Sequence, residues 1–290
     1  MKRGFSVIWV LSLTLIILVG FLVLLFVYSV SAENIVWQDK YSVEDQLSLR
    51  EKESFKRISQ IERELGGGSF ESDQASAVVK LWCPDDNYEQ NAFVNIGSGT
   101  IISSDGIILT NKHVVLNQDA TVIRSSPACY VGVTEDISKP VDFKYTADII
   151  ASSPASPGVF SFDVAVLKIT EACVYCAGEE SFPEEFPYVE MGNSSSLFPG
   201  DEVSIIGYPA IGAGTWNYTQ GIISGKLGEF ILKTDAKIDA GNSGGAALND
   251  KNELIGIPAW IISGAAESIG YIITIDEIKK WYEGSVLPGL

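Results

Sequence analysis

The sequence predicts an all-β body, a sandwich or barrel, that follows an N-terminal membrane helix and a helical stalk. Three observations carry this prediction. An uncharged apolar run opens the chain, a charged stretch without proline or glycine follows it, and from about residue 72 onward many short β-rich runs are separated by turn signals. Regularly spaced short strands are typical of sandwiches and barrels.

The membrane helix is predicted at residues 6–28, a run long enough to cross a bilayer. Lys2 and Arg3 precede it, so residues 1–5 should be a cytoplasmic tail and the rest of the chain should lie outside the cytoplasm. A cleaved signal peptide ending at Ala32 is the alternative. The length of the run favours a retained signal anchor. In both cases the body is extracytoplasmic.

Residues 33–68 are predicted to form a linker and a helical stalk. Ser42 with Asp45 resembles a helix N-cap, apolar residues recur near helical spacing up to Leu65, and Gly66-Gly67-Gly68 ends the pattern. A weak coiled coil, or a helix that packs on the body or is simply solvated, fits the same stretch.

The body is predicted to span 69–290 and to consist of two β halves, about 72–175 and about 186–275, with a terminal helix at 276–283. The irregular, proline-containing stretch Cys173–Tyr188 is the expected connection between the halves.

The net charge argues against one class of binding partner. The formal net charge of −17 repels phosphate backbones, so no nucleic-acid partner is expected.

Four cysteines, Cys83, Cys129, Cys173 and Cys176, suit an oxidising compartment, and sequence alone leaves three pairings open. Disulfides or buried thiols are favoured over a zinc site, because the chain has one CxxC and one histidine. We expect no metal and no cofactor.

Three segments contain the residues of a nucleophilic site. His113 is the single histidine and follows an apolar run, Asp163 opens another apolar run, and Ser243 lies within Gly241-Asn242-Ser243-Gly244-Gly245. Each has a structural alternative, namely a lone structural His, a hydrogen-bonded buried carboxylate and a plain turn. Together they supply a nucleophile, a base that titrates near neutrality and a carboxylate to orient it.

The strings Gly97-Ser98-Gly99-Thr100, Leu109–Val115, Asp163–Lys168 and Gly241–Gly245 resemble trypsin-like serine proteases, closest to the HtrA/Deg branch. The resemblance covers about residues 72–283. It implies a chymotrypsin-like double six-stranded β-barrel with the site between the barrels. His113 would be the general base, Asp163 its orienting partner and Ser243 the nucleophile. The oxyanion hole would comprise Gly241, Asn242 and Ser243.

The resemblance also implies a primary specificity pocket at Lys237, Ile238, Ala240 and Ala259. Lys237 there would favour an acidic substrate residue, unless its side chain reaches water. The resemblance ends near the end of the chain, so we expect no peptide-binding PDZ domain.

The predicted function is a membrane-anchored extracytoplasmic serine endopeptidase that cleaves unfolded or exposed polypeptide segments. A homo-oligomer, a trimer by family resemblance, is a further expectation. A latent protease-fold module that binds chains without cleaving them is the alternative. An esterase on the α/β-hydrolase fold is disfavoured, because that fold has the order Ser, acid, His.

Overall fold

The computed structural model describes residues 72–87, 94–137, 139–154, 161–173, 176, 182–210, 215–263 and 268–285. They belong to a compact unit that runs from Phe70 to Leu290. The predicted tail, membrane helix, linker and stalk lie outside the described residues. Among the helices that are described, none combines the length and the apolar character needed to cross a bilayer.

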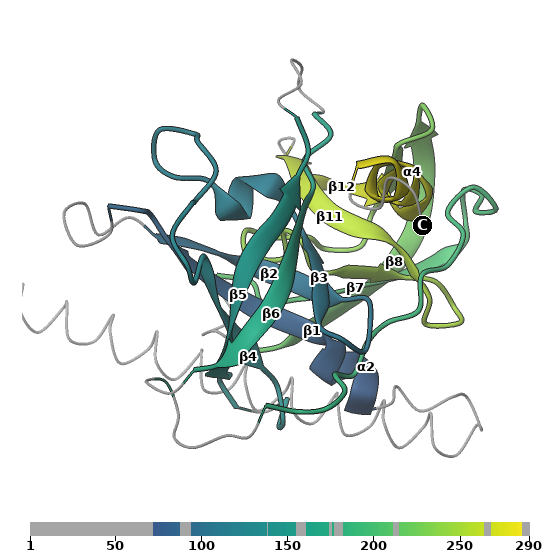
Figure 1. The fold of residues 1–290 in the computed structure, drawn as a ribbon. Helices are drawn as coiled ribbons and strands as arrows, with labels where there is room; N and C mark the ends of the chain where they lie inside the picture. Colours follow the sequence, from purple (N-terminus) through teal and green to yellow (C-terminus); the bar gives the residue numbers. More distant parts are fainter. Residues whose placement is uncertain are drawn as a thin grey trace, which may run out of the picture. The chain divides into compact units, whose positions relative to one another are not determined.

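Two closed six-stranded barrels form the body (Figure 1), which confirms the predicted fold class. The N-terminal barrel has the strand order β1-β2-β3-β6-β5-β4 and the C-terminal barrel the order β10-β11-β12-β9-β8-β7. The elements are α2 (Ser72–Ala77), β1 (Val78–Pro84), β2 (Val94–Ile101), β3 (Ile107–Thr110), the 3₁₀ helix η1 (Lys112–Val115), β4 (Cys129–Val133), β5 (Asp142–Ser152), β6 (Ala165–Ala172), β7 (Glu202–Gly207), β8 (Asn217–Leu227), β9 (Ile231–Thr234), β10 (Ala246–Leu248), β11 (Leu254–Ser263), β12 (Ser268–Thr274) and α4 (Ile275–Ser285).

Side-chain alternation explains why these runs close into barrels. In β1, Leu81 and Cys83 are fully buried, while Lys80 and Trp82 between them are only half-buried. Each strand of a barrel places one set of side chains in the interior and the other set outside. In β6, Ala165, Val166 and Leu167 are all fully buried, because this strand is covered on both faces.

A buried tyrosine joins the two barrels. Tyr208 follows β7 of the C-terminal barrel, and its hydroxyl donates to the carbonyl of Val78 at the start of β1 (3.0 Å). The same hydroxyl lies 2.5 Å from Oγ1 of Thr134, beyond β4. Burial raises the pKa of the Tyr208 phenol above its ordinary value, so the group stays protonated and can donate. Because the hydroxyl is hydrogen-bonded to Val78 and Thr134, its burial at the barrel boundary does not leave it unpaired.

The terminal helix α4 braces the connection between the barrels. Its first turn is held by Ser194, whose Oγ accepts the N–H of Asp276 (3.2 Å), and by Lys279, which donates to the carbonyl of Gly192 (2.6 Å). Trp281 on the same helix makes an edge contact with Phe162, with ring centroids 5.9 Å apart. The helix therefore contacts the N-terminal barrel directly before Asp163.

Two disulfides settle the cysteine pairing. Cys83 on β1 is bonded to Cys129 on the neighbouring β4, across a sequence separation of 46. Cys173 is bonded to Cys176, across a separation of 3, just after β6. The first bridge ties together two strands of one barrel, whereas the second closes a single turn in the connection.

Removing the first bridge should therefore cost more stability than removing the second. From loop closure alone, replacing both Cys83 and Cys129 by Ala should lower the free energy of unfolding by about 4 kcal/mol, against about 2 kcal/mol for Cys173 and Cys176. Urea unfolding of the two double variants measures the difference. An equal or larger loss for the Cys173 and Cys176 variant would contradict this account.

Acid stability should depend on Asp105, in the turn before β3. Lys168 Nζ donates to its carboxylate (2.7 Å), as does Ser103 Oγ (2.5 Å), and these bonds lower the pKa of Asp105 below its ordinary value. A lowered folded-state pKa adds stability above the unfolded pKa, and this stability is lost as pH falls through the folded pKa. Between about pH 5 and pH 2 the wild type should thus lose more stability than Asp105→Asn. Urea unfolding over a pH series tests this, and parallel curves for the two proteins would refute it.

Candidate active site

His113 lies at the start of the 3₁₀ helix that follows β3. Val114 and Val115 directly after it are buried, which anchors the turn in the N-terminal barrel. The imidazole itself is 45% exposed. The segment thus fixes the backbone while leaving the ring open to the solvent side of the site.

Asp163 holds both the backbone and the ring of His113. It precedes β6, its side chain is only 10% exposed, and its Oδ1 accepts the backbone N–H of His113 (2.9 Å). Its Oδ2 lies 2.6 Å from His113 Nδ1. Since a carboxylate only accepts, Nδ1 carries the proton and Nε2 keeps a free lone pair, which is the tautomer of a general base. Asn111 Nδ2 donates to the Asp163 carbonyl (2.8 Å) and so fixes the backbone of the acid.

Ser243 lies between β9 and β10 of the C-terminal barrel, packed against the segment that bears His113. A Cβ on Gly97 would lie 2.7 Å from the Val114 side chain and 3.4 Å from the Ser243 carbonyl oxygen, so this glycine separates the two segments. A Cβ on Gly244 would collide with Thr110 and Ser98. The serine and histidine segments, far apart in sequence, are therefore neighbours at the barrel boundary.

Four successive peptide groups around Ser243 show a distinct hydrogen-bond pattern. All four carbonyls, from residue 240 to residue 243, accept hydrogen bonds: from Ala210 N (2.7 Å), Ser98 Oγ (2.7 Å), Gly245 N (2.9 Å) and Ser98 N (2.9 Å), in that order. The N–H groups of Asn242 and Gly244 donate to the carbonyls of Asp239 and Pro258 (both 3.0 Å). Within the described residues, the N–H groups of Gly241 and Ser243 donate no hydrogen bond.

Two unpaired backbone donors beside a serine are what the predicted oxyanion hole calls for. In a trans peptide the N–H points away from the preceding carbonyl, and the carbonyls of Ala240 and Asn242 are each held by another partner. The direction of both donors is thus fixed, and neither is used by a partner within the described residues. Asn242 is predicted as a third member of the hole, but its N–H already donates to the carbonyl of Asp239. Its carbonyl accepts the N–H of Gly245.

The hydroxyl of Ser243 is half-buried and makes no hydrogen bond to His113 among the described residues; the ring bonds to Asp163 alone. Hydrogen bonds between a nucleophile and its base are often long before substrate binds, so this geometry leaves the predicted pairing open.

The four predicted pocket residues occupy different environments. Ile238 and Ala259 are buried, whereas Lys237 and Ala240 are exposed. The side chain of Ile238 fills the space that a Cβ on Gly270 of β12 would take. Lys237 lies at the surface, and Thr219 Oγ1 donates to its backbone carbonyl (2.7 Å). This exposed position fits the alternative in which the Lys237 side chain reaches water.

Sequence reasoning gave no role to three residues that shape the site. Ser98 supports two of the four carbonyls, Ala210 supports a third, and Asn111 holds the backbone of Asp163. Ser98 and Asn111 lie in strings quoted for the family resemblance, but a motif does not show which side chain contacts which loop. Ala210 acts only through its backbone and leaves no sequence signal.

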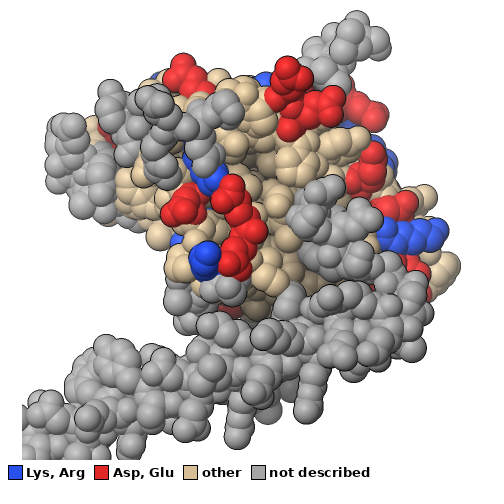
Figure 2. Space-filling view, turned by 90° about the horizontal axis from the view of Figure 1, so that it is seen from below, with Lys and Arg blue, Asp and Glu red and all other residues tan. Residues whose placement is uncertain are grey.

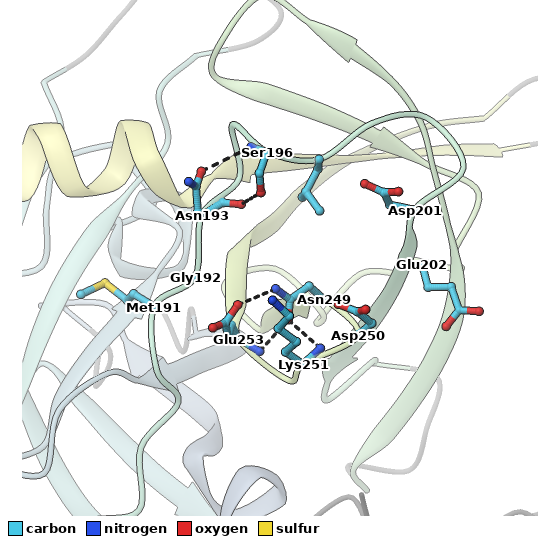
Figure 3. Close-up of a pocket in the computed structure, with 11 residues that line it drawn as sticks. Met191, Gly192, Asn193, Ser196, Asp201, Glu202, Asn249, Asp250, Lys251 and Glu253 are labelled. Atoms are coloured by element: carbon cyan, nitrogen blue, oxygen red, sulfur yellow. Dashed lines mark hydrogen bonds between the residues drawn. The ribbon is translucent and has the colours of Figure 1, made fainter. Parts of the chain in front are cut away.

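A polar cavity of about 880 Å³ lies away from these residues, on the C-terminal barrel (Figure 3). Asp201, Glu202, Asp250 and Glu253 line it together with Lys251. Glu253 and Asn249 are hydrogen-bonded to each other (2.8 Å), so part of the lining is already paired. No residue of the predicted triad borders this cavity.

Acidic side chains gather in several groups on the face shown in Figure 2, with a few basic ones between them. This distribution follows from the net charge of −17 for the whole chain. An acidic surface favours solubility and disfavours polyanionic partners.

Two six-stranded barrels with a His–Asp pair beside a serine loop define the class of chymotrypsin-fold serine hydrolases. Comparison with known families gives the assignment. Residues 97–257 match the trypsin-like peptidase domain, and the chain belongs to that family.

Related proteins place the chain near the HtrA and Deg proteases. It is 33% identical over 219 residues to "Putative protease Do-like 14" of Arabidopsis thaliana, covering 71% of this chain and 45% of that protein. It is 33% identical over 203 residues to "Periplasmic serine endoprotease DegP" of Escherichia coli K12, covering 66% of this chain and 36% of DegP. A solved structure of the HtrA-type protease AlgW with a tripeptide matches with a TM-score of 0.55 and 27% identity, over 75% of this chain and 62% of that one. The chain thus spans less than half the length of these two curated relatives.

Close packing around Gly244 predicts that a single methyl group disturbs the site. Gly244 has φ +80°, and an added Cβ would meet Thr110 and Ser98. Gly244→Ala should therefore lower the free energy of unfolding by about 2 to 4 kcal/mol and slow labelling of Ser243 by a fluorophosphonate. Gly200, with φ +102° and open space around it, is the matched control.

Gly200→Ala carries the same backbone strain without the collision, so its cost should be about 1 to 2 kcal/mol with normal labelling. Thermal or urea unfolding and the labelling rate measure both effects. Equal losses in the two variants would show that packing at the barrel boundary is not what restricts residue 244.

Proposed function

We propose that the chain is a serine endopeptidase anchored in a membrane with its protease body outside the cytoplasm. Ser243 is the nucleophile, His113 the general base and Asp163 the residue that orients the imidazole. The substrates are unfolded or exposed polypeptide segments, and no cofactor takes part. Family membership, the relatives named as serine endoproteases, and the geometry around His113 and Ser243 support this proposal.

The proposed reaction starts with attack of the Ser243 hydroxyl oxygen on the peptide carbonyl carbon. His113 Nε2 takes the hydroxyl proton, and Asp163 stabilises the imidazolium through Nδ1–H. The carbonyl oxygen becomes an oxyanion that the N–H groups of Gly241 and Ser243 bind. The imidazolium then protonates the leaving amine, the C–N bond breaks, and an acyl-enzyme forms. Water, deprotonated by His113, hydrolyses the ester and restores the serine.

One observation carries the proposal furthest, namely the two N–H groups left open beside the nucleophile. A loop whose four carbonyls from residue 240 to residue 243 are paired, and whose N–H groups at Gly241 and Ser243 are not, suits an anionic ligand. A plain turn, the structural alternative for Gly241–Gly245, has no need of that pattern.

The absence of a hydrogen bond between Ser243 and His113 favours one second candidate, a latent protease-fold module that binds chains without cleaving them. It would share the fold and the oxyanion loop but would lack turnover.

The membrane anchor at residues 6–28, the body from 69 to 290 and a homo-oligomer, a trimer in the resembling family, belong to the same proposal. The apolar run after Lys2 and Arg3 supports the anchor and its orientation. The two disulfides support an oxidising compartment.

Removal of the proposed nucleophile tests the function. Ser243→Ala should abolish fluorophosphonate labelling and lower casein cleavage at least about 10⁴-fold, because no oxygen remains to form the acyl-enzyme. Asp163→Asn should keep labelling but slow it about 10³- to 10⁴-fold, since the imidazole loses the partner that selects its tautomer. Labelling and cleavage assays on all three proteins give the result.

Equal labelling of the wild type and Ser243→Ala would rule out Ser243 as the nucleophile. Efficient labelling of the wild type without any cleavage of casein or a peptide library would favour the latent module.

A further inference from the structure

We propose that Ser98 is a positioning residue of the site, whose side-chain hydroxyl holds the peptide group between Gly241 and Asn242 and thereby keeps the oxyanion donors in place. The inference rests on the proposed function and extends it to a residue of the opposite barrel. Ser98 lies on β2 and is fully buried.

The direction of both hydrogen bonds of the Ser98 hydroxyl is determined. The backbone N–H of Tyr208 donates to Ser98 Oγ (2.9 Å), so the hydroxyl accepts there. Its single proton therefore goes to the carbonyl of Gly241 (2.7 Å). With one donor and one acceptor bond at complementary sites, the hydroxyl has a single orientation.

The Gly241–Asn242 peptide needs such a restraint. Gly241 has φ +99°, a conformation that glycine leaves easily because it has no side chain to restrict it. The peptide is held at both ends, at its carbonyl by Ser98 Oγ and at its N–H by the carbonyl of Asp239 (3.0 Å). The N–H groups of Gly241 and Ser243 belong to the peptide planes on either side, which share the Cα atoms of Gly241 and Asn242 with this one, so a displacement of this plane displaces both donors.

The hydroxyl can be tested apart from the other support that Ser98 gives. The backbone N–H of Ser98 donates to the carbonyl of Ser243 (2.9 Å), and a substitution of the side chain leaves that bond in place. Ser98→Ala therefore removes the restraint on Gly241, together with the acceptor of the Tyr208 N–H, while the backbone of residue 243 stays tethered to β2.

The chain offers a matched control in Ser194. It is also buried, at 2% exposure, and its hydroxyl also accepts a backbone N–H, that of Asp276 in α4. It lies outside the hydrogen-bond set of the oxyanion loop. Ser194→Ala thus removes a buried serine hydroxyl of the same kind from the same body.

The experiment compares the full chain with its Ser98→Ala and Ser194→Ala variants on a peptide ester or amide substrate. Active sites are counted by saturating fluorophosphonate labelling. We expect kcat of Ser98→Ala to fall about 10- to 100-fold with KM within about threefold, because the lost restraint matters for the oxyanion and not for ground-state binding. The inhibition constant of a peptidyl boronate should rise by the same factor as kcat/KM falls. Ser194→Ala should keep the wild-type values.

Wild-type kcat per labelled site in Ser98→Ala would overturn the inference, as would an equal loss in Ser194→Ala or a loss confined to KM. Ser98→Cys is the second variant if Ser98→Ala does not fold. Its thiol is a weak donor, so its kcat should also fall, and a wild-type value would again overturn the inference. A wild type that is neither labelled nor active overturns the proposed function itself, an outcome distinct from an active wild type with an unaffected Ser98 variant.

Discussion

The site depends on one contact, in which β2 of the N-terminal barrel holds the serine loop of the C-terminal barrel. The backbone N–H of Ser98 bonds the carbonyl of Ser243, and its hydroxyl bonds the carbonyl of Gly241. His113 and Asp163 belong to the N-terminal barrel and Ser243 to the C-terminal barrel, so the relative placement of the proposed base and the proposed nucleophile is set where the barrels touch. Tyr208 reinforces the same boundary through Val78 and Thr134.

Small residues make this contact possible. Gly97 separates the Val114 side chain from the Ser243 carbonyl, and Gly244 lies where a side chain would strike Thr110. Packed interiors do not deform continuously, so a site built on such approaches has few alternative arrangements. The same constraint explains why the loop can hold two N–H groups open: the surrounding bonds, not the donors themselves, determine its shape.

The sequence was informative wherever local chemistry decides the structure. Short β-rich runs separated by turn signals predicted the β body, and His113, Asp163 and the glycine-rich serine string suggested a proton-relay site before any geometry was known. It could not give the cysteine pairing, because Cys83 and Cys129 meet only through strand order. It also gave no role to Ser98, whose partners lie more than one hundred residues away. For Lys237, spacing from Ser243 left two interpretations open, a pocket base or a side chain that reaches water, and the residue is exposed. Long-range topology decided each of these cases.

The two peptide planes that flank Gly241 are held by different numbers of hydrogen bonds. Rotating the Ala240–Gly241 peptide breaks one hydrogen bond, to Ala210, whereas rotating the Gly241–Asn242 peptide breaks two, to Ser98 and Asp239. Each such bond contributes about 0.5 to 1.5 kcal/mol net, so the two flips differ in cost by about one bond and both lie within a few kcal/mol. The Ala240–Gly241 peptide, held by a single bond to the exposed Ala210, is therefore the more weakly held of the two planes, and Ser98 and Asp239 hold the other more firmly.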